Sequence, residues 1–222
     1  MQKDLNISDF FPNQKKNVFE PCKAIRRLLY KLKAVRLVVG DQMELMVDLH
    51  TRFSPDEAIW FCREAEDLDL FLVEDPIRSE NVTSYRNLRK SVRVPLAAGE
   101  QWASKWEFRQ AIEEELIDYA RIDLCVAGSL TEARKIAGWC ETHYIKILPH
   151  NPLGPVCTAA SLHLNIATNN SGPQELVPPL ISCYPMCSNV HLNSKVTKLH
   201  YQMSLAWALN LIKKRQRIIL EK

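Results

Sequence analysis

The sequence lacks the features that mark several large classes of protein. No apolar run is long enough to cross a bilayer, and we expect no secretory signal because the opening residues MQKD carry no apolar stretch. Neither common nucleotide-binding loop, G-x-G-x-x-G after a strand or G-x-x-x-x-G-K-[ST], is present. The net charge of +3 over 222 residues is too small to indicate nucleic acid or a membrane surface as a partner.

The cysteines and the overall composition indicate an ordinary globular protein. Seven cysteines are an odd number without the spacing of a disulfide framework, so we expect reduced thiols and a cytoplasmic location. Charged residues at 25% and apolar residues at 46% are typical of globular chains. A chain of this length can bury the core of one or two domains.

The chain divides into three zones. Residues 1–22 are polar and irregular, residues 23–176 predict alternating helices and strands, and residues 177–222 form a divergent tail. In the tail, residues 200–212 are apolar enough for a helix, and the basic run 213–217 is typical of a solvated helix end or, less often, a nucleic-acid patch. Zinc binding by the tail is a weak alternative because the spacing fits no common finger. Its ligands would be Cys183, Cys187, His191 and His200.

The middle zone predicts a repeated strand and helix. Three S/T-x-x-E sequences that could act as capping boxes, 54–57, 104–107 and 129–132, predict helix starts. Helices are expected at 24–39, 54–67, 82–91, 104–116, 129–143 and 158–168, and strands at 45–48, 70–74, 94–98, 118–123, 145–148 and near Glu175. Such alternation implies an α/β fold with parallel strands and right-handed crossovers.

Two α/β architectures fit this order, a doubly wound open sheet and a TIM-type (β/α)₈ barrel. We favour the barrel because polar residues with chemical potential close every successive strand, and in a barrel those strand ends converge on one axis. About six parallel strand-helix units are expected, which is an incomplete barrel.

Three acidic residues end consecutive strands at one repeating distance. Asp48, Glu74 and Glu100 are separated by 26 and 26 residues, which fits one strand, one helix and two turns. Identical units stacked side by side would bring the three carboxylates together, where they repel one another unless a cation lies among them. Hard oxygen ligands indicate Mg²⁺, so we predict a magnesium site.

Histidines and further acids follow the same strand ends. His50 lies two residues beyond Asp48 and would share its face on an extended strand, which favours a catalytic or ligand role. Asp123 and His150 end neighbouring strands, and a carboxylate paired with an imidazole produces a general base or, in the simpler interpretation, a structural hydrogen bond. Glu175 lies 25 residues past His150 and is a candidate partner for a substrate.

Several short segments resemble one family when they are taken together. They are MVDLH at 46–50, LVEDPI at 72–77, AGEQ at 98–101 and PHNPLGP at 149–155. These segments resemble the enolase superfamily, within it the mandelate racemase and muconate lactonizing enzyme group, and most of all the D-galactonate dehydratases. The resemblance covers residues 24–175.

The resemblance implies a role for each candidate residue. Asp48, Glu74 and Glu100 match the magnesium ligands, and Glu175 matches a glutamate that contacts the substrate. His150 matches the general base with Asp123 as its partner, and His50 matches the acid on the opposite side. The implied reaction removes water from a sugar acid to give a 2-keto-3-deoxy acid. The expected partner is therefore a small-molecule sugar acid. A homo-oligomer is one assembly that the chain allows.

The sequence also departs from the family pattern. The N-terminal capping domain and the first two barrel strands are not recognisable, and residues 177–222 do not resemble the family's ending. A truncated gene product is therefore one hypothesis, because the spacing of the site is intact beside absent flanking parts. The alternatives are a catalytically inactive remnant that binds a partner through its open sheet edges, and a racemase or epimerase on the same scaffold.

Overall fold

The computed structural model describes residues 19–152 and 154–175. The chain divides into two compact units, Met1–Met43 and Glu44–Lys222, and each is described by itself. The expectations for the first eighteen residues and for the tail, including the zinc-ligand set, the basic run and the C-terminal helix, lie outside the described residues. The domain limits expected from composition stay a prediction.

The first unit contains one helix, α1 (Pro21–Val39), among its described residues. It begins three residues before the predicted start because a proline suits the first turn, where no backbone N–H is needed. It ends at Gly40, whose φ of 56° gives the helix its stop and whose N–H donates to the Arg36 carbonyl at 2.9 Å. The helix that periodicity predicted over 24–39 is confirmed.

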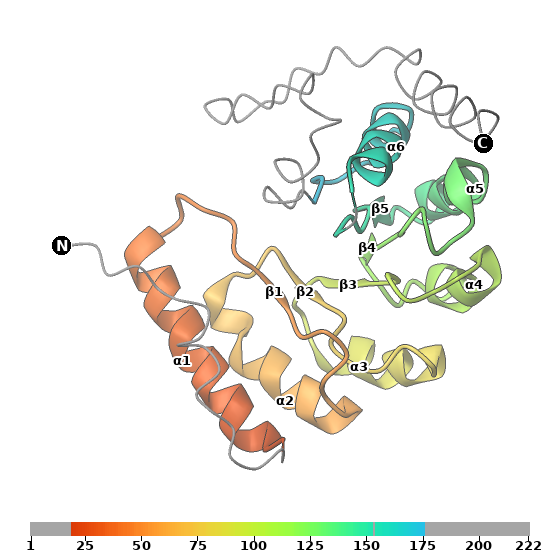
Figure 1. Ribbon diagram of the computed structural model, residues 1–222. Coiled ribbons are helices and arrows are strands. Elements are labelled where there is room, and N and C mark those ends of the chain that lie inside the picture. The colour runs from red at the N-terminus through yellow and green to blue at the C-terminus, as the bar shows by residue number, and fades with distance from the viewer. Residues whose placement is uncertain (1–18, 153, 176–222) are drawn as a thin grey trace, which may run out of the picture. The chain divides into compact units, whose positions relative to one another are not determined.

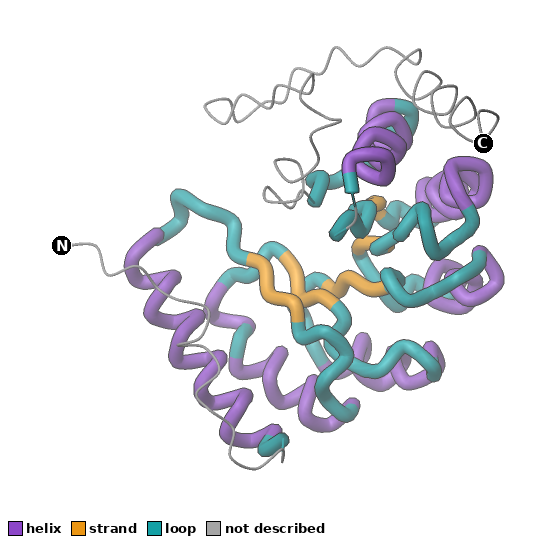
Figure 2. Tube along the Cα trace, in the orientation of Figure 1, coloured by secondary structure: helices purple, strands orange, loops and turns teal. Residues whose placement is uncertain are grey.

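The second unit alternates strands and helices throughout its described part (Figures 1 and 2). Its elements are β1 (Met46–Asp48), α2 (Pro55–Glu64), η2 (Glu66–Leu68), β2 (Leu72–Glu74), η3 (Val82–Ser84), α3 (Tyr85–Ser91), β3 (Leu96–Ala98), α4 (Lys105–Glu113), β4 (Tyr119–Ala120), α5 (Ser129–Thr142), β5 (Lys146–Ile147) and α6 (Pro155–Ile166). The strands pair in the order β1-β2-β3-β4-β5, and all four pairings are parallel. Helices α2 to α5 follow the sheet along one side (Figure 1). The predicted α/β fold with parallel strands is confirmed.

The expected sixth strand near Glu175 is reduced to a single bridge between Ile147 and Ser171 in the described part of the chain. Two neighbours explain why the pairing stays this short. The side-chain amide of Asn170 donates to the Ile145 carbonyl at 2.9 Å, in place of a backbone ladder bond. Pro149 has no N–H to donate to the Gly172 carbonyl, which would be the next bond of the ladder.

The three predicted capping boxes have different outcomes. At α2 the Ser54 N–H donates to the Glu57 carboxylate at 2.8 Å, so the first box is confirmed. At α4 the Glu107 carboxylate reaches one residue further back, to the Ala103 N–H at 2.6 Å. At α5 the prediction is wrong, because residue 129 is already the first helical residue.

The N-cap of α5 is Gly128 with φ 97°, which has no side chain that could cap the helix. Glu132, which the third box assigned to the cap, instead pairs with Lys105 at 2.7 Å and with Lys135. The Glu132 carboxylate can bind either the two lysine ammonium groups or the free backbone N–H groups at the start of the helix. In this structure it binds the lysines.

A small apolar core lies on one face of the sheet. Leu72, Ala97, Tyr119 and Leu148 are buried together from successive strands or their ends, and Phe71 packs against them with its ring 5.3 Å from the Tyr119 ring. Residues i and i+2 of a strand share a face. Three polar residues, Glu74, Arg121 and His150, each follow one of these core residues by two positions. They are therefore placed on the same side of the sheet, further toward the carboxyl ends of the strands.

Candidate functional site

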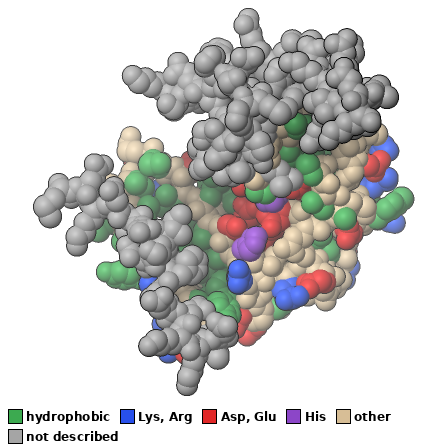
Figure 3. All heavy atoms as spheres, viewed as in Figure 1, with side chains coloured by type: hydrophobic (Ala, Val, Ile, Leu, Met, Phe, Trp, Pro, Cys, Tyr) green, Lys and Arg blue, Asp and Glu red, His purple; other side chains and the backbone are tan. Residues whose placement is uncertain are grey.

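The carboxyl ends of the strands carry a dense set of charged side chains. Glu74, Arg121 and His150 each follow a core residue by two positions, after Leu72, Tyr119 and Leu148. Figure 3 shows acidic and histidine side chains gathered at the centre of this face. The register of the parallel strands, with Asp48 opposite Glu74, brings the ends level with one another.

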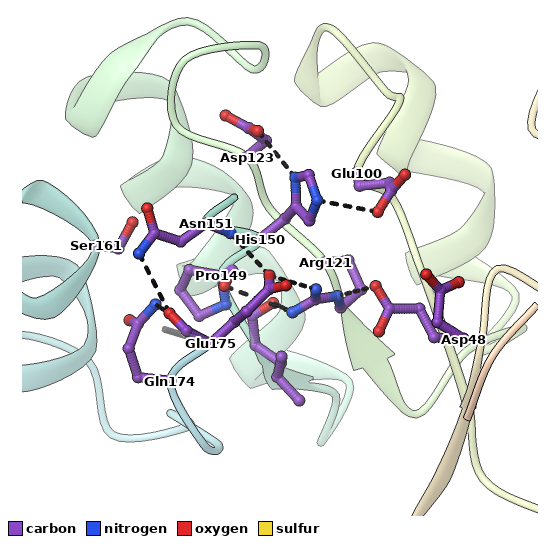
Figure 4. A network of polar contacts seen from close by, with 12 residues as sticks. Asp48, Glu100, Arg121, Asp123, Pro149, His150, Asn151, Ser161, Gln174 and Glu175 are labelled. Atoms are coloured by element: carbon purple, nitrogen blue, oxygen red, sulfur yellow. Dashed lines mark hydrogen bonds and ion pairs between the residues drawn. The ribbon is translucent and has the colours of Figure 1, made fainter. Parts of the chain in front are cut away.

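His150 is held between two carboxylates. Its Nδ1 lies 2.9 Å from Asp123 Oδ2 and its Nε2 lies 3.1 Å from Glu100 Oε2 (Figure 4). Burial opposes the charged imidazolium, but the hydrogen bond with Asp123 and the charge of Glu100 outweigh it, so the pKa of His150 is raised above its ordinary value. The predicted Asp123–His150 pair is present in the structure.

Backbone N–H groups hold the Asp123 carboxylate in the orientation in which it contacts His150. Its Oδ1 accepts the backbone N–H of Cys125 at 2.7 Å and of Val126 at 3.3 Å, which leaves Oδ2 for His150. Burial acts to raise the pKa of Asp123, yet the hydrogen bonds from His150 and Cys125 together lower it. The carboxylate is therefore charged and directed at one ring nitrogen, which sets the tautomer of His150.

His50 lies on the other side of Glu100. Its Nδ1 is 3.5 Å from Glu100 Oε1 and 3.5 Å from Asp48 Oδ2, and its ring is about half exposed. The expectation that His50 shares a face with Asp48 along an extended strand is wrong, because β1 ends at Asp48. His50 has φ 47° and Thr51 has φ 57°, so a left-handed turn brings the ring back toward the strand end.

Glu100 depends on the glycine before it. Gly99 has φ 129°, and a Cβ there would lie 2.5 Å from Phe108 Cε1. Only glycine fits this turn without displacing the aromatic ring. The turn places the buried Glu100 carboxylate between the two histidines.

Arg121 is a buried cation of this site that was not predicted from the sequence. Its guanidinium donates to Glu175 Oε2 at 2.7 Å (Figure 4), pairs with Glu74, and donates to the Leu148 carbonyl at 3.0 Å. The sequence did contain a signal for Arg121. It lies two residues before Asp123 within the predicted strand 118–123, and residues i and i+2 of a strand share a face. Glu74 still keeps a raised pKa, because its burial exceeds the opposing effect of Arg121.

Glu175 is also held from the backbone side. Its Oε2 accepts the N–H of Asn151 at 2.8 Å, and the Asn151 amide donates to the Glu175 carbonyl at 3.2 Å and to Thr158 Oγ1 at 2.9 Å. Burial acts to raise the pKa of Glu175, but the Asn151 N–H and Arg121 lower it. Asn151 is a second residue that sequence reasoning did not select, although it is adjacent to His150.

Three carboxylates at the strand ends form a group that fits a divalent cation. One oxygen from each of Glu74, Asp75 and Glu100 lies within 4.8 Å of the others. Asp75 Oδ2 is buried and has no hydrogen-bond partner, and burial together with Glu100, Glu74 and Asp48 raises the pKa of Asp75 well above its ordinary value. A cation among these oxygens would supply the missing partner, and an all-oxygen donor set suits Mg²⁺.

The structure therefore brings all the sequence-predicted site residues into one region. Five of them, Asp48, His50, Glu100, His150 and Asp123, are linked side chain to side chain. Glu74 and Glu175 are joined through Arg121, and Glu74 also reaches Glu100 through the carboxylate group. The roles assigned to them stay predictions, and Asp75 enters as an additional oxygen donor next to Glu74.

Comparison with known proteins identifies the family. The model of the family described as "Enolase C-terminal domain-like" matches residues 7–195. The chain belongs to this family. The strand ends that carry the charged site are thus those of an enolase-type barrel, of which this chain contains a part.

Curated relatives and solved structures agree with that assignment. The chain is 35% identical over 161 residues to a D-mannonate dehydratase of Caulobacter sp. (strain K31), covering 72% of this chain and 40% of the relative. It is 39% identical over 146 residues to a D-galactonate dehydratase family member of Streptomyces bingchenggensis (strain BCW-1), covering 65% of this chain and 36% of the relative. The chain spans about two fifths of the length of these relatives.

A similar solved structure contains ligands. It is an enolase from Pantoea ananatis with bound D-gluconate and Mg, with TM-score 0.72, 30% identity, and coverage of 79% of this chain and 44% of that one. In the described part of our chain, no helix is both long and apolar enough to span a membrane.

Proposed function

We propose that this chain contains the catalytic part of a magnesium-dependent sugar-acid dehydratase. One observation carries the proposal: His150 lies between Asp123 and Glu100, at the edge of a group of carboxylates that fits a divalent cation. The curated relatives named as mannonate and galactonate dehydratases support the reaction class.

His150 is the proposed general base. With Asp123 on Nδ1, the Nε2 atom faces the carboxylate group and is the nitrogen that takes the proton from C2 of the sugar acid. The charged form that results is stabilised by Asp123, which is itself fixed by the Cys125 N–H. The electron pair left at C2 moves into an enediolate.

His50 is the proposed general acid. It meets the opposite oxygen of Glu100 from the one that His150 meets, so the two imidazoles approach from different sides of one carboxylate. As the C3–O bond breaks, His50 delivers a proton to the departing hydroxyl. The resulting enol becomes a 2-keto-3-deoxy acid.

Mg²⁺ would be held by Glu74, Glu100 and, from the sequence spacing, Asp48, with Asp75 as a further oxygen donor beside them. When bound, it supplies positive charge that stabilises the enediolate. Glu175 would accept a hydrogen bond from a sugar hydroxyl, and Arg121 would keep it in place.

The direct test separates proton removal from elimination. The chain is incubated in D₂O with Mg²⁺ and D-gluconate, D-galactonate or D-mannonate, and NMR follows both exchange of the C2 proton and the 2-keto-3-deoxy product. His150→Asn should lower both rates by about 10²- to 10⁴-fold, as expected for loss of a general base. His50→Asn should lower elimination more than exchange.

The matched control is His143→Asn, which changes a histidine that pairs with Glu115 at the end of α5. It should leave both rates unchanged. A wild-type rate in His150→Asn would contradict the proposal. A C2 epimer formed without loss of the 3-hydroxyl would instead support the racemase alternative.

One observation keeps a second candidate function open. In the described part of the chain β1 pairs with β2 alone, so its other edge is unpaired. A non-catalytic protein that binds a partner through this sheet edge fits that arrangement. It predicts neither C2 exchange nor product with any sugar acid, even where Mg²⁺ raises the melting temperature.

A further inference from the structure

Two thiols that the proposed reaction does not use lie beside its base. Cys125 is exposed in the loop after β4, and Cys157 is buried in the first turn of α6. Their Sγ atoms and a carboxylate oxygen of Asp123 all lie within 4.8 Å of one another. The fold thus joins donors that are 32 residues apart in the sequence.

Backbone contacts hold these donors in place. Asp123 Oδ1 accepts the Cys125 N–H at 2.7 Å, and the Asp123 carbonyl accepts the Ala127 N–H at 2.8 Å, which makes a tight turn around Cys125. Cys157 lies in the helix, where its Sγ is 4.0 Å from Ser161 Oγ one turn later. Donors that are fixed in this way lose little freedom when a ligand binds.

We propose that Asp123, Cys125 and Cys157 form a site for a thiophilic divalent cation such as Zn²⁺ or Cd²⁺. Two sulfur atoms and one carboxylate oxygen are a donor set that Zn²⁺ accepts, with a fourth position open to water. The set differs in kind from the all-oxygen group of Glu74, Asp75 and Glu100, because soft thiolates do not suit Mg²⁺.

Binding of a cation has to displace the proton of the buried thiol. Burial, with a smaller effect of Cys125, raises the pKa of Cys157 to about 12. The buried thiol therefore stays protonated without a cation, and binding displaces its proton. A cation at this position also has a consequence that rests on the proposed function. It competes with His150 for Asp123, so it should inhibit proton abstraction.

Cd²⁺ is the probe, because bound thiolates give it a strong ultraviolet charge-transfer absorption. The reduced chain carries Cys183→Ala and Cys187→Ala, so that the tail cysteines do not contribute. We expect the absorption to saturate at one Cd²⁺ per chain and to persist in excess Mg²⁺. Cys125→Ser should weaken Cd²⁺ binding by at least about 100-fold, since even loss of an outer-shell partner costs about 10- to 100-fold.

Two further variants keep the test decisive. Cys157→Ala should weaken Cd²⁺ binding as much as Cys125→Ser does. Cys125 is exposed, so its substitution leaves the core intact even where the change at the buried Cys157 impairs folding. Cys140→Ser, a buried cysteine of α5 outside both donor groups of the described residues, should bind Cd²⁺ like the parent. Three results would contradict the proposed site. They are unchanged absorption in Cys125→Ser, no absorption in the parent, and a 125–157 disulfide as the sole reaction of the thiols. None of these readouts depends on dehydration.

Discussion

At the amino end of β4, Asp118 has its charge balanced by its own partners: Arg89 at 2.7 Å and the Leu96 N–H at 2.8 Å. At the carboxyl end of the strands, Glu74, Asp75 and Glu100 are crowded together and Arg121 is the cation that contacts this group through Glu74. The first arrangement satisfies its groups within the chain. The second leaves the Asp75 Oδ2 atom buried without a partner.

The comparison distinguishes two kinds of charged group. Asp118 stabilises the fold through partners within the chain, whereas Glu74, Asp75 and Glu100 lack enough partners and favour binding of a cation. An acid such as Asp118, about one-third exposed and paired with a cation and an N–H, contributes modestly and needs no further partner. Buried acids in excess raise the free energy of the metal-free fold, because each is desolvated near like charges. Changes at the two ends of the strands should therefore have opposite signs or very different sizes.

The largest difference is expected between two arginines. Arg121→Met keeps the volume but leaves Glu74 and Glu175 without their cation in a buried place, so unfolding free energy should fall by about 3–5 kcal/mol. Arg89→Met should cost about 0–1 kcal/mol, because its pair with Asp118 is about one-third exposed. Urea unfolding of both variants measures this, and equal losses would remove the contrast.

A glycine pair tests the backbone on which the site is built. Gly99→Ala should lower the unfolding free energy by about 3 kcal/mol, because φ is 129° and the new Cβ would meet Phe108. Gly138→Ala in α5 has open space around its Cβ and should raise stability by up to about 1 kcal/mol. Thermal melting decides the point, and a harmless Gly99→Ala would show that the turn before Glu100 is adaptable.

Neutralising one acid at each end should give opposite signs. The pKa of Asp75 is raised in the folded state, so its charge destabilises the fold once the pH exceeds its ordinary value. Asp75→Asn should therefore raise the metal-free melting temperature at pH 7 by a few degrees, equivalent to about 1 kcal/mol. Asp118→Asn should lower it, since it weakens the contacts with Arg89 and Leu96. A fall in both variants would contradict the distinction.

The smallest effect is expected at the surface. The Glu114 pKa is lowered, chiefly by its hydrogen bonds with Arg86, so this pair contributes stability above the ordinary pKa of a glutamate and loses it as the pH falls through the lowered value. Glu114→Gln should be slightly less stable than the parent at neutral pH and equal to it in acid. Parallel melting curves across that pH range measure the difference, and a gap that widens in acid would reverse the sign.

The sequence predicted the parts of the site that repeat. Because Asp48, Glu74 and Glu100 recur at one spacing and each strand ends in register with the next, their convergence follows from the pattern alone. His150 and Asp123 were found for the same reason. The α/β order and five of the expected strands were also predictable, since short apolar runs alternate with helical periodicity.

What was missed depends on long-range packing. Arg121 was overlooked because a buried arginine is recognisable only when its partners, 47 and 54 residues away, are known. The shortening of the last strand to a bridge at Ser171 depends on Asn170, whose partner Ile145 is 25 residues away. The left-handed turn at His50 left no signal in the apolar pattern of the sequence. The approach of Cys125 to Cys157 depends on where α6 begins after His150, and the spacing of neither cysteine indicated it.

The most direct test is a Mg²⁺ titration of the melting temperature of this chain, with Glu100→Gln beside it. Binding to the folded state alone should stabilise the parent by about 2.7 kcal/mol when free Mg²⁺ is about 100 times its dissociation constant. Glu100→Gln should show little of this rise while melting at or above the parent temperature without Mg²⁺. A parent that does not respond to Mg²⁺, or a variant that responds equally, would contradict the view that these crowded carboxylates are held for a cation.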